Sequence, residues 1–327
     1  MYIVMEKSKK TIIKHIPHFL EYCEVGKGLS NLTIKNYDRF LRPFQNWLNK
    51  NKLLNLLPHN LTQKHIWDYR LYLSRYVNPN LKSNLQKTTQ NYYLIALRNL
   101  LSYFAEKDIS SLPPEKVKLG KDKKSRVVKF LSLDQIEKLL LSPDIKKFIG
   151  LRDRAILEVL FSTGLRVSEL IALNIDVINL EILNKNKKKG LELVIIGKGE
   201  QPRTVYLSNR AIEWLIRYLN ERHDDDLALF INALQHKNIL SKRLSARSIE
   251  IMIKKYCKLT GLPITTTPHT IRHSYATDLL EQGVDLRTIQ EFLGHRNIVT
   301  TQVYTHVTNK HLRDVHQAFH SGRNLKN

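Results

Sequence analysis

Residues 268–304 hold the side chains with the clearest chemical potential in the chain. His269 and Arg272 are three residues apart, so on a helix they share one face. Pro268 suits the first turn of that helix, because its missing N–H would have no partner there in any case. A helix start binds phosphate through its free backbone N–H groups and the positive end of its dipole. This segment therefore predicts a phosphate site.

The same stretch supplies a second imidazole and a phenol. Gly294 ends a helical pattern and is expected to turn His295 back toward the His269 face. Tyr304 follows nine residues after His295, and taken singly it is only one of 14 tyrosines. Taken together with two histidines and an arginine, it predicts nucleophilic attack on a phosphodiester.

Two arginines are candidates for stabilising the charge that such an attack places on the phosphate oxygens. The planar guanidinium binds phosphate through two parallel hydrogen bonds, which suits Arg166 and Arg272 to this task. Glu169 lies one helical turn after Arg166 and is expected to hold that guanidinium in place. The alternative for Arg166 and Glu169 is an ordinary exposed ion pair worth ~0.3–0.5 kcal/mol.

A zinc site is the main chemical alternative for the histidines. His269 and His273 are four residues apart, as in the two-histidine helical motif of metalloproteases. Thr270 occupies the position of that motif's catalytic glutamate, and no third ligand stands out. We therefore expect no metal here, and we expect His273 to pack or to cap.

Net charge is the strongest compositional signal. The 327 residues hold 53 Lys and Arg against 30 Asp and Glu, a formal charge of +23. The excess is 13 in residues 1–125 and 10 in the rest, which predicts a polyanion bound from both halves. Solubility alone needs a net charge of only ~2–8. Two distant cysteines, the lack of an apolar run near ~20 residues and the lack of a signal peptide predict a cytoplasmic protein with no membrane partner.

The spacing of apolar residues predicts two domains joined by a basic linker. Residues 1–108 contain four helical patterns and no strand signal, which predicts an all-α binding domain. Pro43 is expected to kink or break the second of these helices. Residues 109–128 carry a Pro-Pro pair and clustered lysines, which are typical of an extended linker. Residues 129–327 form the second domain.

The second domain is expected to be mostly helical with a small sheet. The strand-like segments are residues 177–183, 191–196 and 203–207. The lysine-rich segment 184–190 connects the first two, and Lys198 lies between two glycines in the turn before the third. The pattern is helical throughout from residue 208 onward, and residues 309–319 predict a short amphipathic tail helix.

Five boxes in this order resemble those of the phage-integrase type of tyrosine recombinase. They are residues 162–170 around Arg166, 197–199 around Lys198, 268–277 with His269 and Arg272, 293–295 ending in His295, and 300–306 around Tyr304. The helical first domain resembles the SAM-like core-binding domain of that family. The start of the chain close to these helices resembles the Xer-like members.

The resemblance implies a site-specific recombinase that cuts and rejoins double-stranded DNA within a two-domain clamp, without a metal or nucleotide cofactor. Tyr304 would attack a phosphodiester to give a 3′-phosphotyrosine, and Lys198 would be the general acid for the leaving 5′-oxygen. Arg166 and Arg272 would stabilise the transition state. His269 and His295 would assist protonation and phosphate binding.

The resemblance also implies assembly: four protomers on two DNA sites, either identical or paired with a related recombinase. Chromosome-dimer resolution and mobile-element integration or excision both fit this chemistry. Two other functions remain open, a monomeric topoisomerase-like nicking-closing enzyme and a DNA-binding regulator with a vestigial site. The lysine-rich segment 184–190 departs from the family by being longer than its usual β-turn.

Overall fold

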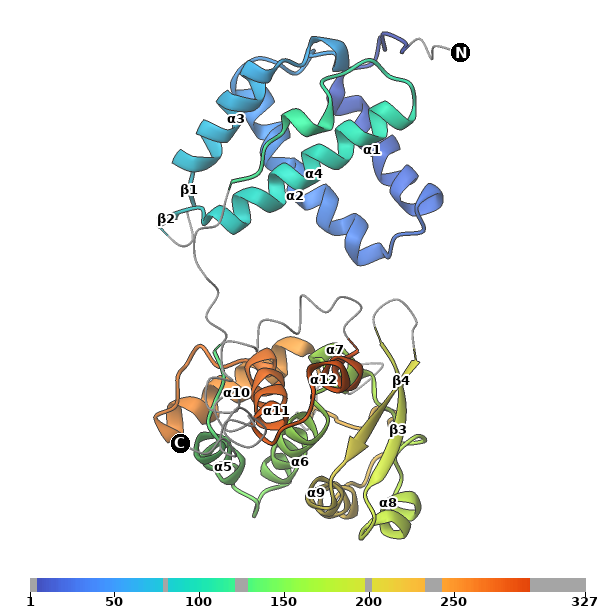
Figure 1. Cartoon of the computed structure of the whole chain (residues 1–327), viewed down its shortest axis with the longest axis vertical. Helices are drawn as coiled ribbons and strands as arrows, with labels where there is room; N and C mark the ends of the chain where they lie inside the picture. Colours follow the sequence, from blue (N-terminus) through green and yellow to red (C-terminus); the bar gives the residue numbers. More distant parts are fainter. Residues whose placement is uncertain (1–4, 79–81, 121–128, 198–201, 233–242, 295–327) are drawn as a thin grey trace, which may run out of the picture. The chain divides into compact units, whose positions relative to one another are not determined.

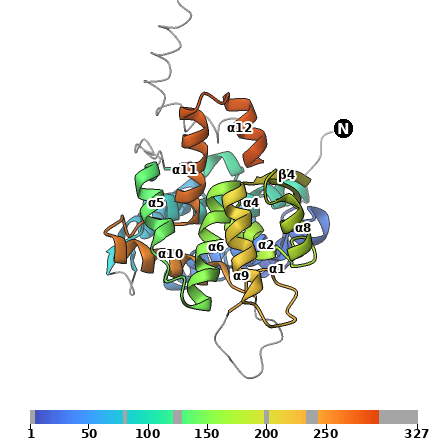
Figure 2. The same cartoon turned by 90° about the horizontal axis from the view of Figure 1, so that it is seen from below.

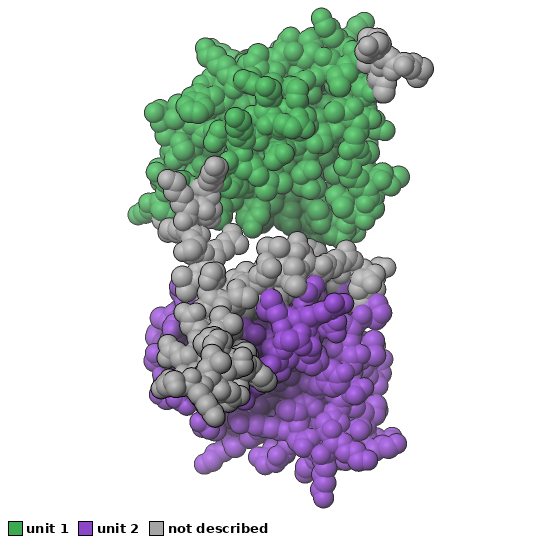
Figure 3. All heavy atoms as spheres, in the orientation of Figure 1, with its two compact units in different colours: residues 1–126 green, residues 127–327 purple. Residues whose placement is uncertain are grey.

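The computed structural model describes residues 5–78, 82–120, 129–197, 202–232 and 243–294 (Figure 1). The chain divides into two compact units, Met1–Arg126 and Val127–Asn327, and each unit has its own hydrophobic core (Figure 3). Helices dominate both units, with two small antiparallel sheets of two strands each, which confirms the predicted fold class. Within the described ranges, no helix combines the length and apolarity needed to cross a membrane.

The first unit contains the four predicted helices. They are α1 Ile12–Glu21, α2 Asn31–Lys50, α3 Gln63–Arg75 and α4 Lys87–Glu106, and a π-helical turn Tyr22–Gly26 follows α1. Helix α2 is continuous through Pro43, so of the predicted kink or break the break does not occur. The prediction of no strands was also wrong, because β1 Val77–Asn78 pairs with β2 Ser83–Asn84.

The first part of the predicted linker packs on the first unit instead of extending away from it. Val117 is buried in the core of this unit, just after a 3₁₀ turn at Pro114–Lys116. Asn91 and Gly120 exchange two hydrogen bonds of 2.9 Å, side chain to backbone. The expectation of an extended linker was therefore wrong for residues 109–120, and residues 121–128 lie outside the described residues.

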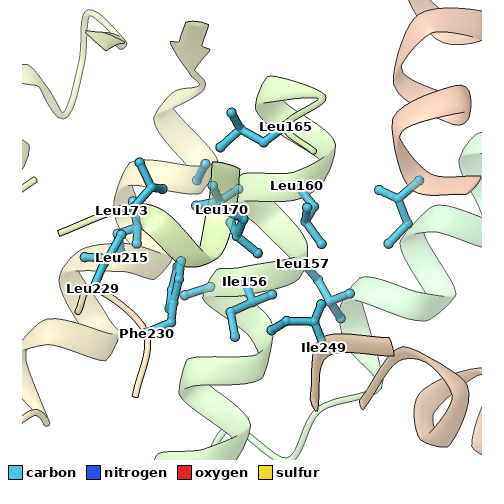
Figure 4. Close-up of a cluster of buried hydrophobic side chains, with 14 of the residues drawn as sticks. Ile156, Leu157, Leu160, Leu165, Leu170, Leu173, Leu215, Leu229, Phe230 and Ile249 are labelled. Carbon is cyan, nitrogen blue, oxygen red and sulfur yellow. The ribbon is translucent and has the colours of Figure 1, made fainter. Parts of the chain in front are cut away.

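The second unit is built around helix α6. Its elements are α5 Leu133–Leu141, α6 Phe148–Thr163, α7 Val167–Ala172, α8 Leu180–Asn186, β3 Leu191–Ile196, β4 Pro202–Leu207, α9 Asn209–Asn220, α10 Ala246–Thr260, α11 Pro268–Glu281 and α12 Leu286–Leu293. Helix α6 packs against α5, α9, α11 and β4. Figure 4 shows its Ile156 and Leu160 in the apolar cluster with Leu170 of α7.

Two sequence predictions for this unit were wrong. Residues 177–183 do not form a strand, because the Asn179 side chain accepts a 2.9 Å hydrogen bond from the N–H of Ile182 and so starts helix α8. Residues 221–232 are not helical. Arg222 is buried there and donates to the carbonyls of Ala228 and Leu229, which holds the segment as a loop.

The two helices that carry the candidate site have a small core of their own. Ala276 and Leu280 of α11 pack with Ile289 and Leu293 of α12. Figure 2 shows the two helices side by side at one end of the unit, and α12 also contacts β4. This arrangement brings the ends of α6, α12 and β4 close to α11.

Candidate active site

The end of α6 positions Arg166. Gly164 ends the helix in the left-handed conformation with φ 59°, and a Cβ there would lie 2.5 Å from Cδ1 of Tyr275. Only glycine fits both demands. The chain then turns into α7, where Arg166 precedes the first helical residue and its N–H donates to Oε2 of Glu169 at 2.8 Å.

Glu169 holds the Arg166 guanidinium by a second contact. Nη1 of Arg166 donates to Oε1 of Glu169 at 2.8 Å, and Nη2 donates to the carbonyl of Gly294 at 3.1 Å. The Glu169 side chain is only 4% exposed. The pair is therefore not the exposed surface pair that was the alternative, and the guanidinium has one orientation.

Arg272 is buried in α11 and joins the ends of two other helices. Its Nη1 donates to the carbonyl of Gly164 at 2.6 Å, and its Nη2 donates to the carbonyl of Leu293. Both carbonyls belong to helix C-termini, where the partial negative charge favours a cation.

The helix start that was predicted to bind phosphate is present beside Arg272. Thr267 caps α11, with its hydroxyl accepting from the N–H of Thr270 at 3.3 Å, and Pro268 is the first helical residue, as predicted. His269 follows at the surface. Burial of part of the ring, then the charges of Arg272 and Arg166, lowers the pKa of His269, so the ring is neutral at neutral pH.

Two neighbours on α11 are poorly suited to act in place of these residues. Burial and the nearby His269 and Arg272 lower the pKa of His273 to about 4, so this ring stays neutral. Burial raises the pKa of Tyr275 to about 12, which disfavours the phenolate that a nucleophile needs. In the described residues, no group of three or more His, Cys, Asp or Glu side chains could hold a metal ion.

The sequence reading missed Arg203 of β4, which contacts the same carboxylate. Nη2 of Arg203 donates to Oε2 of Glu169 at 2.8 Å, and the Arg203 side chain is 9% exposed. One signal was available in the sequence. Because strand side chains alternate, Arg203 lies on the same face as Val205 and Leu207, both of which are buried in the core.

The structure therefore brings together four of the seven predicted site residues: Arg166, Glu169, His269 and Arg272. Lys198, His295 and Tyr304 lie outside the described residues. Gly294, the residue before His295, ends α12 in the left-handed conformation with φ 61°, as predicted for a helix end. A cluster of fixed guanidinium groups beside a neutral imidazole is suited to binding a phosphate diester.

Comparisons with known proteins agree on one family. The model of the phage integrase family matches residues 129–311, and the model of the phage integrase N-terminal SAM-like domain matches residues 16–107. Tyrosine recombinase XerD of Lacticaseibacillus casei is 35% identical over 311 residues, covering 93% of this chain and 98% of that protein. Tyrosine recombinase XerD of Listeria innocua is 36% identical over 307 residues with the same coverage.

Solved structures of similar fold include two protein–DNA complexes. XerH site-specific recombinase bound to palindromic difH substrate has a TM-score of 0.74 at 23% identity, covering 96% of this chain and 98% of that one. A lambda integrase dimer bound to a COC′ core site has a TM-score of 0.62 at 15% identity, covering 90% of this chain and 77% of that one. At these identities the likeness concerns the fold.

Proposed function

The chain belongs to the phage integrase family and is a tyrosine recombinase, and from this premise we propose that it recombines double-stranded DNA at specific sites. The observation that carries the proposal is the arginine cluster at the ends of α6, α11 and α12. Arg166 and Arg272 are fixed by Glu169 and by three backbone carbonyls. Both guanidinium groups are therefore held in position before a phosphate binds. Charges fixed in advance can stabilise the transition state without any reorganisation during the reaction.

The proposed reaction conserves the energy of the broken bond. The Tyr304 oxygen attacks the phosphorus, the bond to the 5′-oxygen breaks, and a 3′-phosphotyrosine and a 5′-hydroxyl result. Arg166 and Arg272 stabilise the charge on the non-bridging oxygens. His269 and His295 assist phosphate binding and proton transfer, and Lys198 gives the leaving oxygen its proton. A second 5′-hydroxyl reverses the steps and rejoins the strands.

The proposed partners are duplex DNA and further recombinase protomers. Two of the similar solved structures are bound to DNA, and one of them is a dimer. We extend this to a tetramer on two DNA sites, formed by this chain alone or with a related recombinase. Chromosome-dimer resolution and integration or excision of a mobile element both use this reaction. Buried, unpaired Cys23 and Cys257 support the cytoplasm as the compartment.

The first test replaces the proposed nucleophile. Tyr304→Phe should bind DNA as the wild type does and form no covalent adduct, because the phenol oxygen is gone. A suicide substrate with a nick beside the scissile phosphate, read on a denaturing gel, measures adduct formation. Tyr275→Phe is the matched control and should still form the adduct. An adduct in Tyr304→Phe that disappears in Tyr275→Phe would move the nucleophile to α11.

The second test separates the general acid from DNA contacts. Lys198→Ala should cleave ordinary DNA ~10²–10⁴-fold more slowly, the usual contribution of a positioned acid. Replacing the bridging 5′-oxygen by sulfur makes a leaving group that needs no proton. Cleavage of that substrate should be nearly equal for Lys198→Ala and wild type, while Arg272→Ala should stay slow. Without rescue by sulfur, the lysine is a DNA contact and the acid is His269 or His295.

A further inference from the structure

Arg203 carries a buried charge that its surroundings satisfy only in part. Its side chain is 9% exposed, and Nη2 donates to Glu169. The Nε and Nη1 groups are fully buried and have no hydrogen-bond partner among the described residues. Unpaired donors on a buried cation are costly, and native proteins keep few of them. Burial also lowers the pKa of this guanidinium, against the opposing effect of Glu169. Such an arrangement calls for a functional reason.

One carboxylate faces three guanidinium groups in this part of the structure. Oε1 of Glu169 accepts from Nη1 of Arg166 at 2.8 Å. Oε2 accepts from Nη2 of Arg203 at 2.8 Å and from the backbone N–H of Arg166 at 2.8 Å. Nη1 of Arg272 lies 4.0 Å from the same Oε2, too far for a hydrogen bond. Glu169 is thus engaged by Arg166 and Arg203 and only approached by Arg272.

We infer that Arg203 is a positioning residue that keeps Glu169 from pairing more closely with Arg272. By occupying Oε2, it holds Glu169 in place so that this oxygen stays 4.0 Å from Nη1 of Arg272, which donates to the carbonyl of Gly164. The Arg272 charge then acts on the scissile phosphate. Without Arg203, Oε2 loses its guanidinium partner while Nη1 of Arg272 lies 4.0 Å away, and a closer pair between Glu169 and Arg272 weakens the field at the phosphate. This inference rests on the proposed recombinase function.

The stem of Arg203 has a separate packing role that a test must preserve. A Cβ added at Gly294 would lie 2.5 Å from Cδ of Arg203 and 2.8 Å from its Nε, so the stem lies directly against the turn that ends α12. Arg166 donates to the carbonyl of that same glycine. A substitution that keeps an unbranched stem of similar length therefore removes the charge and little of the packing.

The test compares Arg203→Met with Arg203→Lys. Methionine keeps the stem, and Glu169 keeps both bonds from Arg166, so no carboxylate is left without a partner. Breaking a buried ion pair is costly when it leaves a charge without a partner, but here Glu169 keeps Arg166 as its counter-charge and the two unpaired donors of Arg203 are removed. We expect an unchanged or higher Tm in phosphate-free buffer. DNA binding should stay within ~3-fold, while single-turnover cleavage slows by ~10–100-fold, less than loss of a direct donor. Arg203→Lys should recover most of the rate, because its ammonium can still engage Oε2.

A neutral scissile group shows whether the defect is electrostatic. Replacing one non-bridging oxygen by methyl removes the negative charge of the phosphodiester, so the arginine field matters less. Arg203→Met and wild type should then cleave this methylphosphonate at rates within ~3-fold of each other. Arg217→Met is the matched control, because Arg217 forms an exposed pair with Glu213, and it should cleave both substrates as the wild type does.

Three results would overturn the inference. They are wild-type cleavage by Arg203→Met, an equal defect on both substrates, and a Tm lowered by several degrees with cleavage restored on cooling, which indicates a structural role. Failure of the proposed function looks different, because the wild-type protein would then form no adduct on any substrate.

Discussion

The two units of this protein are stabilised in different ways. The described part of the first unit buries a single histidine, His15, and no Lys, Arg, Asp or Glu. Its core is apolar and rich in aromatic rings: Phe44 stacks on Trp47 with centroids 5.7 Å apart, and Tyr69 packs edge-on against Phe44 at 5.0 Å. The excess charge of this unit therefore lies at its surface, where it can contact a polyanion.

The second unit buries charge as well as apolar surface. Its buried charged residues are Arg152, Asp153, Arg154, Glu158, Glu169, Arg222 and Arg272. Several of these also donate to backbone carbonyls, as Arg152 does to the carbonyl of Ile231 at 2.8 Å. Buried ion pairs add little net stability, but removing one partner is costly, so they enforce one arrangement.

Surface charge in the first unit suits DNA binding, whereas buried charge in the second unit suits catalysis. Surface lysines and arginines attract DNA over a range of conformations, because the phosphate backbone is a uniform target. Stabilising a transition state requires charges fixed within a fraction of an ångström before the reaction begins. Pairs with a buried carboxylate, such as Arg166 with Glu169, provide that fixation in the second unit. Breaking a buried pair should therefore affect the second unit in ways that the first unit does not share.

The largest effect is expected for Glu158→Gln. Oε1 of Glu158 lies 2.8 Å from Nε and Nη2 of Arg154 and 2.8 Å from Nε of Arg210, and the Arg154 side chain is 4% exposed. The neutral amide leaves a buried guanidinium without its counter-charge, which should lower the free energy of unfolding by about 3–5 kcal/mol. Urea unfolding followed by the fluorescence of Trp214, the second unit's one tryptophan, measures it.

The matched control for this change is Glu213→Gln. Glu213 forms the exposed pair with Arg217 on the same unit, and its loss should change the free energy of unfolding by less than ~0.5 kcal/mol. If Glu158→Gln and Glu213→Gln unfold at the same urea concentration, buried charge is not what distinguishes the second unit.

The next largest effect is expected for Arg272→Ala, on the rate of DNA cleavage. Arg272→Ala removes the guanidinium held between Gly164 and Leu293, and should slow cleavage by ~10²–10³-fold at saturating DNA, since one fixed donor contributes about that much. Its two carbonyl partners lose their donor, so some stability is lost as well. Single-turnover cleavage below the melting temperature measures the rate, with binding measured in parallel. If weaker DNA binding accounts for the whole loss of rate, Arg272 contributes to binding and not to the chemical step.

Much of the fold was predictable because its signals are local. The four helices predicted in residues 1–108 are present as α1 to α4, and Ser132 begins α5 with a hydroxyl that accepts from the N–H of Gln135. The prediction of a strand at residues 177–183 was wrong because a short apolar run is compatible with both a helix and a strand. The N-cap at Asn179 favours the helix here. The prediction of a helix after α9 was wrong because the hydrogen bonds from Arg222 to backbone carbonyls hold this segment as a loop, although its apolar pattern is compatible with a helix.

In the candidate site, too, the residues with local sequence signals were predicted and the residue with a distant partner was not. The boxes around Arg166 and His269 were found because their residues lie three apart on helices, a spacing visible in sequence. Arg203 was missed because its partner Glu169 is 34 residues away. Nothing in local spacing shows which distant groups share one carboxylate, and only strand alternation marked Arg203 as facing inward. The roles of Lys198, His295 and Tyr304 stay predictions.

The smallest effect is the loss of stability at acidic pH, which we expect mainly in the second unit. Burial and the charges of His269 and Arg272 lower the pKa of His273 to about 4, against an ordinary value of 6.5. The unfolded chain therefore takes up a proton near pH 6.5 that the folded unit does not accept until about pH 4. Stability is complete above that window and falls as the pH drops through it, by about 1–2 kcal/mol once solvent screening of the part-exposed ring is allowed for.

His273→Gln cannot titrate, so its Tm should fall less than that of the wild type between pH 7 and 4.5. His15→Gln is the matched change in the first unit, where burial also lowers the pKa of the histidine, and it should leave the acid response of Trp214 unchanged. Parallel Tm curves for His273→Gln and wild type would show that other groups of the second unit carry its acid sensitivity.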